Sequence, residues 1–140
     1  MHNGYLPTVH VPLGFDHSAF DSREYLDYVV DPDSDRLDEA EVLGKLDAMP
    51  PGGTSGNAIA VNRERAYVVC WTPADTRTPR YYAMQLLRTS DRLVIASEVV
   101  PALAPATRWE PLPRRCVLGF PVEDGHARYE EQGEPLWQTS

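Results

Sequence analysis

Few residues of this chain combine the types and the spacing that metal binding or phosphate binding requires. The histidines have no metal-ligand spacing with one another or with either cysteine, so we predict no zinc site; they are His2, His10, His17 and His126. The glycine-rich stretch 51–56 lacks the Lys-Ser/Thr ending of a phosphate-binding loop, and we interpret it as a connector. These patterns indicate no cofactor and no metal.

The two cysteines, Cys70 and Cys116, are the other residues that could do chemistry. Both lie inside apolar runs, which favours buried, unreactive thiols over a disulfide or a nucleophile. A Cys–His catalytic pair stays open at this point, although no pattern in the sequence brings either thiol close to an exposed histidine. Residue chemistry alone therefore does not indicate a reaction.

Length and charge restrict the class of protein. A chain of 140 residues is long enough to form one domain with a hydrophobic core. Its 21 acidic and 13 basic residues give a net charge of −8, and the arginines are scattered, so we expect no nucleic-acid partner. The sequence shows no signal peptide and no apolar run of membrane-spanning length. We therefore expect a soluble, cytoplasmic protein with no membrane partner.

Two hairpins are expected to form the centre of the fold. Apolar, β-branched runs at 58–61 and 66–71 flank a short polar connector, which predicts an antiparallel hairpin. Segments 80–88 and 93–97 predict a second hairpin, although the first of these also fits a helical spacing. Because the runs other than 80–88 are almost continuously apolar, we expect strands that are buried on both faces.

Helices are expected before these hairpins. Asp21, with Glu24 three residues later, indicates a capping box in which Asp21 is the N-cap of a helix that ends before Pro32. A second helix is predicted to start at 33–34 and to end at the Pro-Pro-Gly-Gly segment 50–53. Its buried stripe would be Leu37, Val42, Leu43, Leu46 and Met49.

Further strands are expected towards the end of the chain. Residues 116–120 predict one strand and 127–130 a weak last one, whereas the polar tail 132–140 is expected to fray. Residues 5–20 are interpreted as a loop. Two helices followed by mostly antiparallel strands indicate an α+β fold, in a domain that spans residues 1–131.

The order of several short motifs is more informative than any one of them. Along the chain they are HNG at 2–4, DS at 21–22, RLVIASE at 92–98, and Trp109 followed by Leu112-Pro113. This ordered set resembles the class II glutamine amidotransferases, which are N-terminal-nucleophile (Ntn) hydrolases that release ammonia from glutamine. The resemblance implies an αββα sandwich, in which two mostly antiparallel sheets lie between helical layers.

The resemblance also implies roles for individual residues. In this family an N-terminal cysteine attacks the glutamine carboxamide, and its own α-amino group is the base. Asn3, through its side-chain amide, and Gly4, through its backbone N–H, would form the oxyanion hole. Asp21 would pair with the α-ammonium group of glutamine, and Ser22 shares this substrate-binding motif. Residues 97–98 match a family signature, and we interpret them as structural.

The chain also departs from the family pattern. The nucleophilic cysteine and the arginine that holds the glutamine carboxylate would both lie upstream of the HNG motif, and Met1 cannot replace the cysteine. Arg23 stands where the family usually has glutamate, and the stretch between Gly4 and Asp21 is shorter than in many members. Considered without the other motifs, Asn3-Gly4 fits a turn and Asp21 fits a helix cap.

Two hypotheses of different classes follow. In the first, the chain is the C-terminal part of a glutaminase domain, and an upstream segment or a partner chain supplies the N-terminal cysteine. Such a chain would be inactive alone, and marginally stable or self-associating, because missing strands leave apolar faces and open sheet edges. In the second, the chain is a non-catalytic binding or assembly module. In this family a separate domain or protein normally supplies the acceptor of the ammonia, so this segment does not indicate which acceptor is used.

Overall fold

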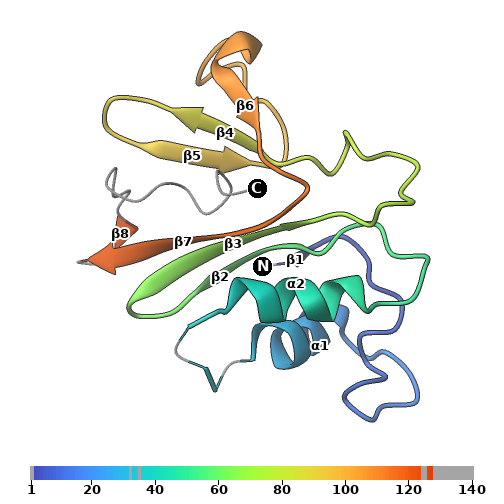
Figure 1. Cartoon of the computed structure of the whole chain (residues 1–140). Coiled ribbons are helices and arrows are strands. Elements are labelled where there is room, and N and C mark those ends of the chain that lie inside the picture. The colour runs from blue at the N-terminus through green and yellow to red at the C-terminus, as the bar shows by residue number, and fades with distance from the viewer. Residues whose placement is uncertain (1, 32, 35, 124–125, 128–140) are drawn as a thin grey trace.

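The computed structural model describes residues 2–31, 33–34, 36–123 and 126–127, which form two antiparallel sheets and two short α-helices (Figure 1). Sheet A contains, in spatial order, β1 (His2–Asn3), β2 (Asn57–Val61), β3 (Arg65–Trp71), β7 (Arg115–Glu123) and β8 (His126–Ala127). Sheet B contains β5 (Leu93–Ala96), β4 (Gln85–Arg88) and β6 (Trp109–Pro111). The helical elements are α1 (Asp21–Tyr25), its π-helical continuation η1 (Leu26–Val30), α2 (Glu39–Asp47) and the 3₁₀ turn η2 (Ala106–Arg108).

These elements form three layers. One face of sheet A packs against α1, η1 and α2, and the other face packs against sheet B (Figure 1). Strand β3 shows the arrangement: Tyr67, Val69 and Trp71 belong to the helix-facing cluster, whereas Val68 and Cys70 belong to the cluster between the sheets. All five side chains are buried, so the prediction of burial on both faces is confirmed for β3.

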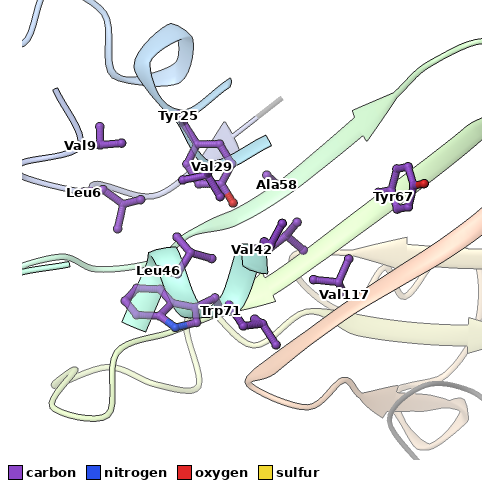
Figure 2. Close-up of a cluster of buried hydrophobic side chains, with 12 residues drawn as sticks. Leu6, Val9, Tyr25, Val29, Val42, Leu46, Ala58, Tyr67, Trp71 and Val117 are labelled. Carbon is purple, nitrogen blue, oxygen red and sulfur yellow. The ribbon is translucent and has the colours of Figure 1, made fainter. Parts of the chain in front are cut away.

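Side chains from both layers build the helix-facing cluster (Figure 2). Leu46 of α2 and Val29 of η1 are completely buried in it. The hydroxyl of Tyr25 donates a hydrogen bond of 2.7 Å to the carbonyl of Gly56, just before β2. Burial raises the pKa of Tyr25, so this hydroxyl stays protonated and remains a donor. These contacts fix the helical layer on sheet A.

Strand β2 does not match the prediction that its apolar run is buried on both faces. Ile59 is 38% exposed and Val61 is 67% exposed. The reason is the position of β2 near the edge of sheet A, where β1 pairs with it at Asn57 and Ala58. Within the described residues, Ala60 and Val61 face no strand on that side.

Both predicted hairpins form, but the second is shorter than expected. Strands β2 and β3 pair around a turn in which Asn62 Oδ1 accepts the N–H groups of Glu64 and Arg65. Strands β4 and β5 also pair antiparallel, but β4 begins at Gln85. Residues 79–82 form turns, so the strand prediction is wrong for the first part of 80–88, and the helical alternative is wrong for this segment.

The first helix starts with a different cap from the one expected. Phe20, and not Asp21, occupies the N-cap position of α1. The cause is Glu24, whose carboxylate reaches further back and accepts the N–H groups of Ala19 at 2.8 Å and Phe20 at 3.3 Å. Asp21 is therefore the first residue inside the helix. Its expected role as a cap is wrong.

The second helix is shorter than expected at both ends. It begins at Glu39 because Asp38 caps it, accepting the N–H of Glu41 at 2.8 Å, and it ends at Asp47. The predicted buried stripe is confirmed at its centre, while Leu37 and Met49 lie outside the helix and are half-buried against the same cluster. The fully buried members are Val42, Leu43 and Leu46.

The α+β class is confirmed, and the strand list differs from prediction in detail. Strands β1 and β6 were not predicted, and β7 is longer than the expected 116–120. On the outer side of sheet B, the indole N–H of Trp109 donates to the carbonyl of Ala104, in the irregular segment before η2. The last strand, β8, overlaps the start of the predicted one, but residues 128–140, with the predicted domain boundary and tail, lie outside the described residues.

Candidate functional site

A hollow of about 290 Å³ lies between the two sheets, where β1 meets β2. We call it the inter-sheet hollow; it is lined by Asn3, Asn57, Ala58, Ile59, Met84, Ile95, Ala96 and Ser97. Asn3 and Ser97, which belong to separate motifs of the sequence, therefore come together here. The lining is apolar apart from two carboxamides and one hydroxyl. Such a surface suits an uncharged polar group better than an ion.

Asn57 is the residue of this hollow that the sequence analysis missed. It faces Asn3 across the β1–β2 pairing and is 3% exposed. Its Nδ2 donates to the carbonyl of Tyr82 at 2.7 Å, and its Oδ1 accepts the N–H of Trp71 at 3.0 Å. A buried amide with both ends bonded is held rigidly, so Asn57 fixes one wall of the hollow.

Gly4 follows Asn3 at a position that only glycine can occupy. Its φ is +136°, and a Cβ atom there would lie 2.2 Å from the carbonyl oxygen of Ser55. The close approach of these two backbones sets the direction in which the chain leaves β1. Packing is therefore a sufficient reason for glycine here, and the predicted role of its N–H in an oxyanion hole remains a prediction.

Asp21 and Ser22 lie on the helical side of sheet A, away from the lining of the inter-sheet hollow. Ser22 lines a second hollow, of about 360 Å³, that we call the helix-side hollow. The rest of its lining is Tyr25, Leu26, Val30, Leu37, Ala58, Ile59, Ala60, Val61, Asn62 and Tyr67. The two hollows share Ala58 and Ile59, so they flank β2 at the same point.

A buried carboxylate holds the loop 5–20 against α1. Glu24 is 4% exposed, and besides the two N–H groups it accepts the hydroxyl of Ser18 at 2.7 Å. Burial by itself would raise the pKa of Glu24, but these three hydrogen bonds and the nearby His10 outweigh it and keep the pKa below its ordinary value. Arg23, which departs from the family pattern, pairs with Asp27 at 2.8 Å on the surface.

Burial makes both cysteine thiols inaccessible to a substrate in this fold. Cys70 and Cys116 are free and buried, and they face each other across β3 and β7. Contact with Cys116, together with burial, raises the pKa of Cys70, so this thiol stays protonated. The Cys–His pair that the sequence left open therefore has no accessible thiol. In the described part of the chain, no group of three His, Cys, Asp or Glu side chains could hold a metal ion.

No protein-family model, curated protein or solved structure matches this chain. Function is therefore inferred from the arrangement of residues around β1 and β2. None of the helices described here has the length and apolar character needed to cross a membrane. Of the two hollows described here, the inter-sheet hollow is the one that brings together Asn3 and Ser97 from separate sequence motifs.

Proposed function

We propose that this chain is the C-terminal part of a glutaminase domain of the class II glutamine amidotransferase type, with an Ntn-hydrolase-like sandwich that is incomplete on its N-terminal side. The observation that carries the proposal is the inter-sheet hollow, where Asn3, followed by Gly4, lies opposite the fixed amide of Asn57. Two stacked antiparallel sheets with helices on one outer face support the same assignment.

In this proposal the inter-sheet hollow binds the side-chain amide of glutamine. A cysteine thiol from an N-terminal segment adds to the amide carbon, and the Asn3 amide and the Gly4 N–H stabilise the charge that develops on the oxygen. The α-amino group of that cysteine takes the thiol proton and passes it to the side-chain amide nitrogen of glutamine, which leaves as ammonia. Water then cleaves the thioester, which gives glutamate and restores the thiol. Each preorganised donor contributes about 3–4 kcal/mol to transition-state stabilisation.

Asp21 and Ser22 would bind the amino-acid end of glutamine from the helical side of β2. In the structure β2 separates the two hollows, which share Ala58 and Ile59 in their linings, so the role of Asp21 and Ser22 is argued from the family resemblance. Because both thiols of this chain are buried, the nucleophile comes from an upstream segment or a partner chain. The free thiols also support a reducing, cytoplasmic location.

The first test combines the intact mass and N-terminal sequence of the protein from its native source with ammonia release from L-glutamine. If the native chain begins with cysteine, Asn3→Ala is expected to lower kcat by about 10²–10³-fold. Asp21→Asn is expected to raise KM more than it lowers kcat, because it contacts a group remote from the reacting bond. The 140-residue chain alone is expected to release no ammonia.

Asp75→Asn is the matched control for Asp21→Asn, because Asp75 is an exposed acid in the connector between β3 and β4. Its kinetic constants should equal those of the unchanged enzyme. An active enzyme that keeps its full kcat after Asn3→Ala would contradict the assigned role of Asn3. Ammonia release by the 140-residue chain itself, abolished by changing Asn3 or Asp21, would contradict the need for another segment.

The second candidate function is a non-catalytic binding or assembly module. The observation that favours it is the outer half of β2, where exposed Val61 lines the uncharged helix-side hollow. Binding of a protein partner that is unaffected by glutamine, in a native chain without an N-terminal cysteine, would support this candidate over the glutaminase.

A further inference from the structure

Three sulfur atoms meet in the core between the two sheets. Cys70 of β3 and Cys116 of β7 stand directly opposite each other in the ladder that joins these strands. Both thiols are free, and the Sγ atom of Cys70 lies 3.6 Å from the Sδ atom of Met84, which precedes β4. All three side chains belong to the same buried cluster. Two thiols and a thioether, from three separate segments of the chain, are therefore neighbours.

The register of the ladder brings the two thiols together. The N–H of Thr72 donates to the carbonyl of Arg114 at 3.1 Å. Hydrogen-bonded pairs recur every two residues, so Cys70 and Cys116 also form such a pair, with Cα atoms about 5.5 Å apart. The hydrogen bond that Cys70 donates lowers the pKa of Cys116 despite its burial. Cys116 is therefore the cysteine that gives up its proton more readily.

The chemistry of these three groups selects a soft metal ion. Thiolate and thioether sulfur favour ions such as copper(I), whereas carboxylate and carbonyl oxygen favour Mg²⁺ and Ca²⁺. Zinc is held by Cys, His, Asp and Glu, and the described residues contain no group of three such side chains. The spacing also fits: an ion about 2.3 Å from two sulfurs that are 3.6 Å apart holds them at about 100°, near the tetrahedral angle.

The position combines an apolar shell with a route of entry. Apart from the three sulfur residues, the buried members of the cluster are Val68, Leu86, Leu112 and Leu118. Such a shell excludes water from a bound ion and favours copper(I) over the more strongly hydrated copper(II). Met84 also lines the inter-sheet hollow, so an ion in this hollow reaches the cluster at Met84.

We propose that Cys70, Cys116 and Met84 bind one copper(I) ion through their three sulfur atoms. Each thiol gives its proton to water when its sulfur binds the ion, the methionine binds as a neutral thioether, and no electron is transferred. This site goes beyond the proposed function and does not depend on it, because neither glutamine nor an N-terminal cysteine takes part.

A copper(I) titration of the 140-residue chain tests this site. It is done without oxygen, in competition with the coloured copper(I) chelator bicinchoninate, and the chain is expected to take up one ion. Met84→Leu keeps an apolar side chain but removes the thioether. It is expected to weaken binding by about tenfold or more, because even changes behind the direct ligands of a metal cost about 10–100-fold.

Met49→Leu is the matched control, because Met49 packs against the helix-facing cluster on the other face of sheet A. Its affinity for copper(I) should equal that of the unchanged chain. Equal affinity of the Met84→Leu variant and the unchanged chain would overturn the proposal. Uptake of no copper by the unchanged chain would also overturn it.

X-ray absorption at the copper edge identifies the ligands without any variant, so this result does not depend on whether a changed core folds. The copper-loaded chain is expected to show three sulfur neighbours at about 2.3 Å. A spectrum dominated by nitrogen or oxygen neighbours would overturn the proposal, because histidines or carboxylates elsewhere would then hold the ion.

Discussion

Sheet A has two halves that differ in completeness. In the inner half, β3 and β7 are covered by helices on one face and by sheet B on the other, and Val69 is 0% exposed. In the outer half, Val61 of β2 is 67% exposed. Both valines come from similar β-branched runs. Neighbouring strands and layers, and not the apolar pattern of a strand, therefore decide how much of the strand is buried.

The two halves are also held by different polar contacts. Beside the inner half, Asp47 of α2 accepts the indole N–H of Trp71 at 2.8 Å and pairs with Arg115 of β7 at 2.7 Å, in an arrangement that is partly exposed. Beside the outer half, Glu24 is buried and holds the preceding loop through three hydrogen bonds. The inner half is therefore joined to α2 by a partly exposed polar contact, whereas the buried charge of Glu24 holds residues 18–20 to α1.

The largest expected difference comes from the same substitution in both halves. Val69→Ala removes two buried methyl groups and leaves a cavity, so it is expected to lower the free energy of unfolding by about 2–3 kcal/mol. Val61→Ala, at the exposed edge, is expected to change it by less than about 0.5 kcal/mol. Urea unfolding followed by tryptophan fluorescence measures both values.

Each of these two variants is the control for the other, because the residue type and the substitution are the same at both positions. Equal costs at the two positions would contradict the division of sheet A into a complete and an incomplete half.

Glu24→Gln gives an intermediate effect on the outer half. Glutamine keeps the shape but loses the charge, and hydrogen bonds to a charged acceptor are stronger than those to a neutral one. We therefore expect a loss of about 1 kcal/mol at pH 7. Because the folded-state pKa of Glu24 lies below its ordinary value of 4.5, its stabilisation is complete above that value and is lost as the pH falls through the folded-state pKa.

Thermal melts of this variant and the unchanged protein between pH 7 and pH 3 check the expectation. The difference in stability should shrink as the pH falls. Glu110→Gln, at an exposed position of β6, is the control and should show little difference at any pH. A Glu24→Gln difference that stays constant down to pH 3 would show that the charge of Glu24 does not contribute.

Local patterns predicted the inner half of the fold better than its edge. Sequence patterns of only a few residues predict three features of the inner half. These are the β2–β3 hairpin, the burial of β3 on both faces and the buried centre of α2. Strands β1 and β6 are only two and three residues long, and they form because they pair with strands distant in the sequence. No local sequence pattern therefore predicts them. The start of α1 was misassigned because Glu24 bonds residues beyond the expected cap.

The candidate site was predictable in part. Asn3 and Gly4 were predicted from a motif, and their catalytic role stays a prediction, whereas the hollow that joins Asn3 to Ser97 arises only when sheets A and B stack. Asn57 was missed because its partner, the carbonyl of Tyr82, lies 25 residues away in a turn that resembled a strand. The predicted link between Asn3 and Asp21 spans β2, and no spacing in the sequence determines what lies between them.

Asp47→Asn tests the polar contact of the inner half and gives the smallest expected effect. The hydrogen bond from Arg115, supported by that from Trp71, lowers the pKa of Asp47 despite its partial burial, so its stabilisation is present above the ordinary pKa and is lost on acidification. Because the side chains of Asp47 and Arg115 are 43% and 56% exposed, solvent screens the pair, and the expected loss is about 0.5–1 kcal/mol.

Salt distinguishes this contact from Glu24, because raising the ionic strength weakens exposed pairs far more than buried ones. Urea unfolding in low and high salt should therefore show the Asp47→Asn difference shrinking while the Glu24→Gln difference persists. If the Asp47→Asn difference survives high salt, the inner half also depends on a desolvated charge, and the contrast between the halves lies in apolar burial alone.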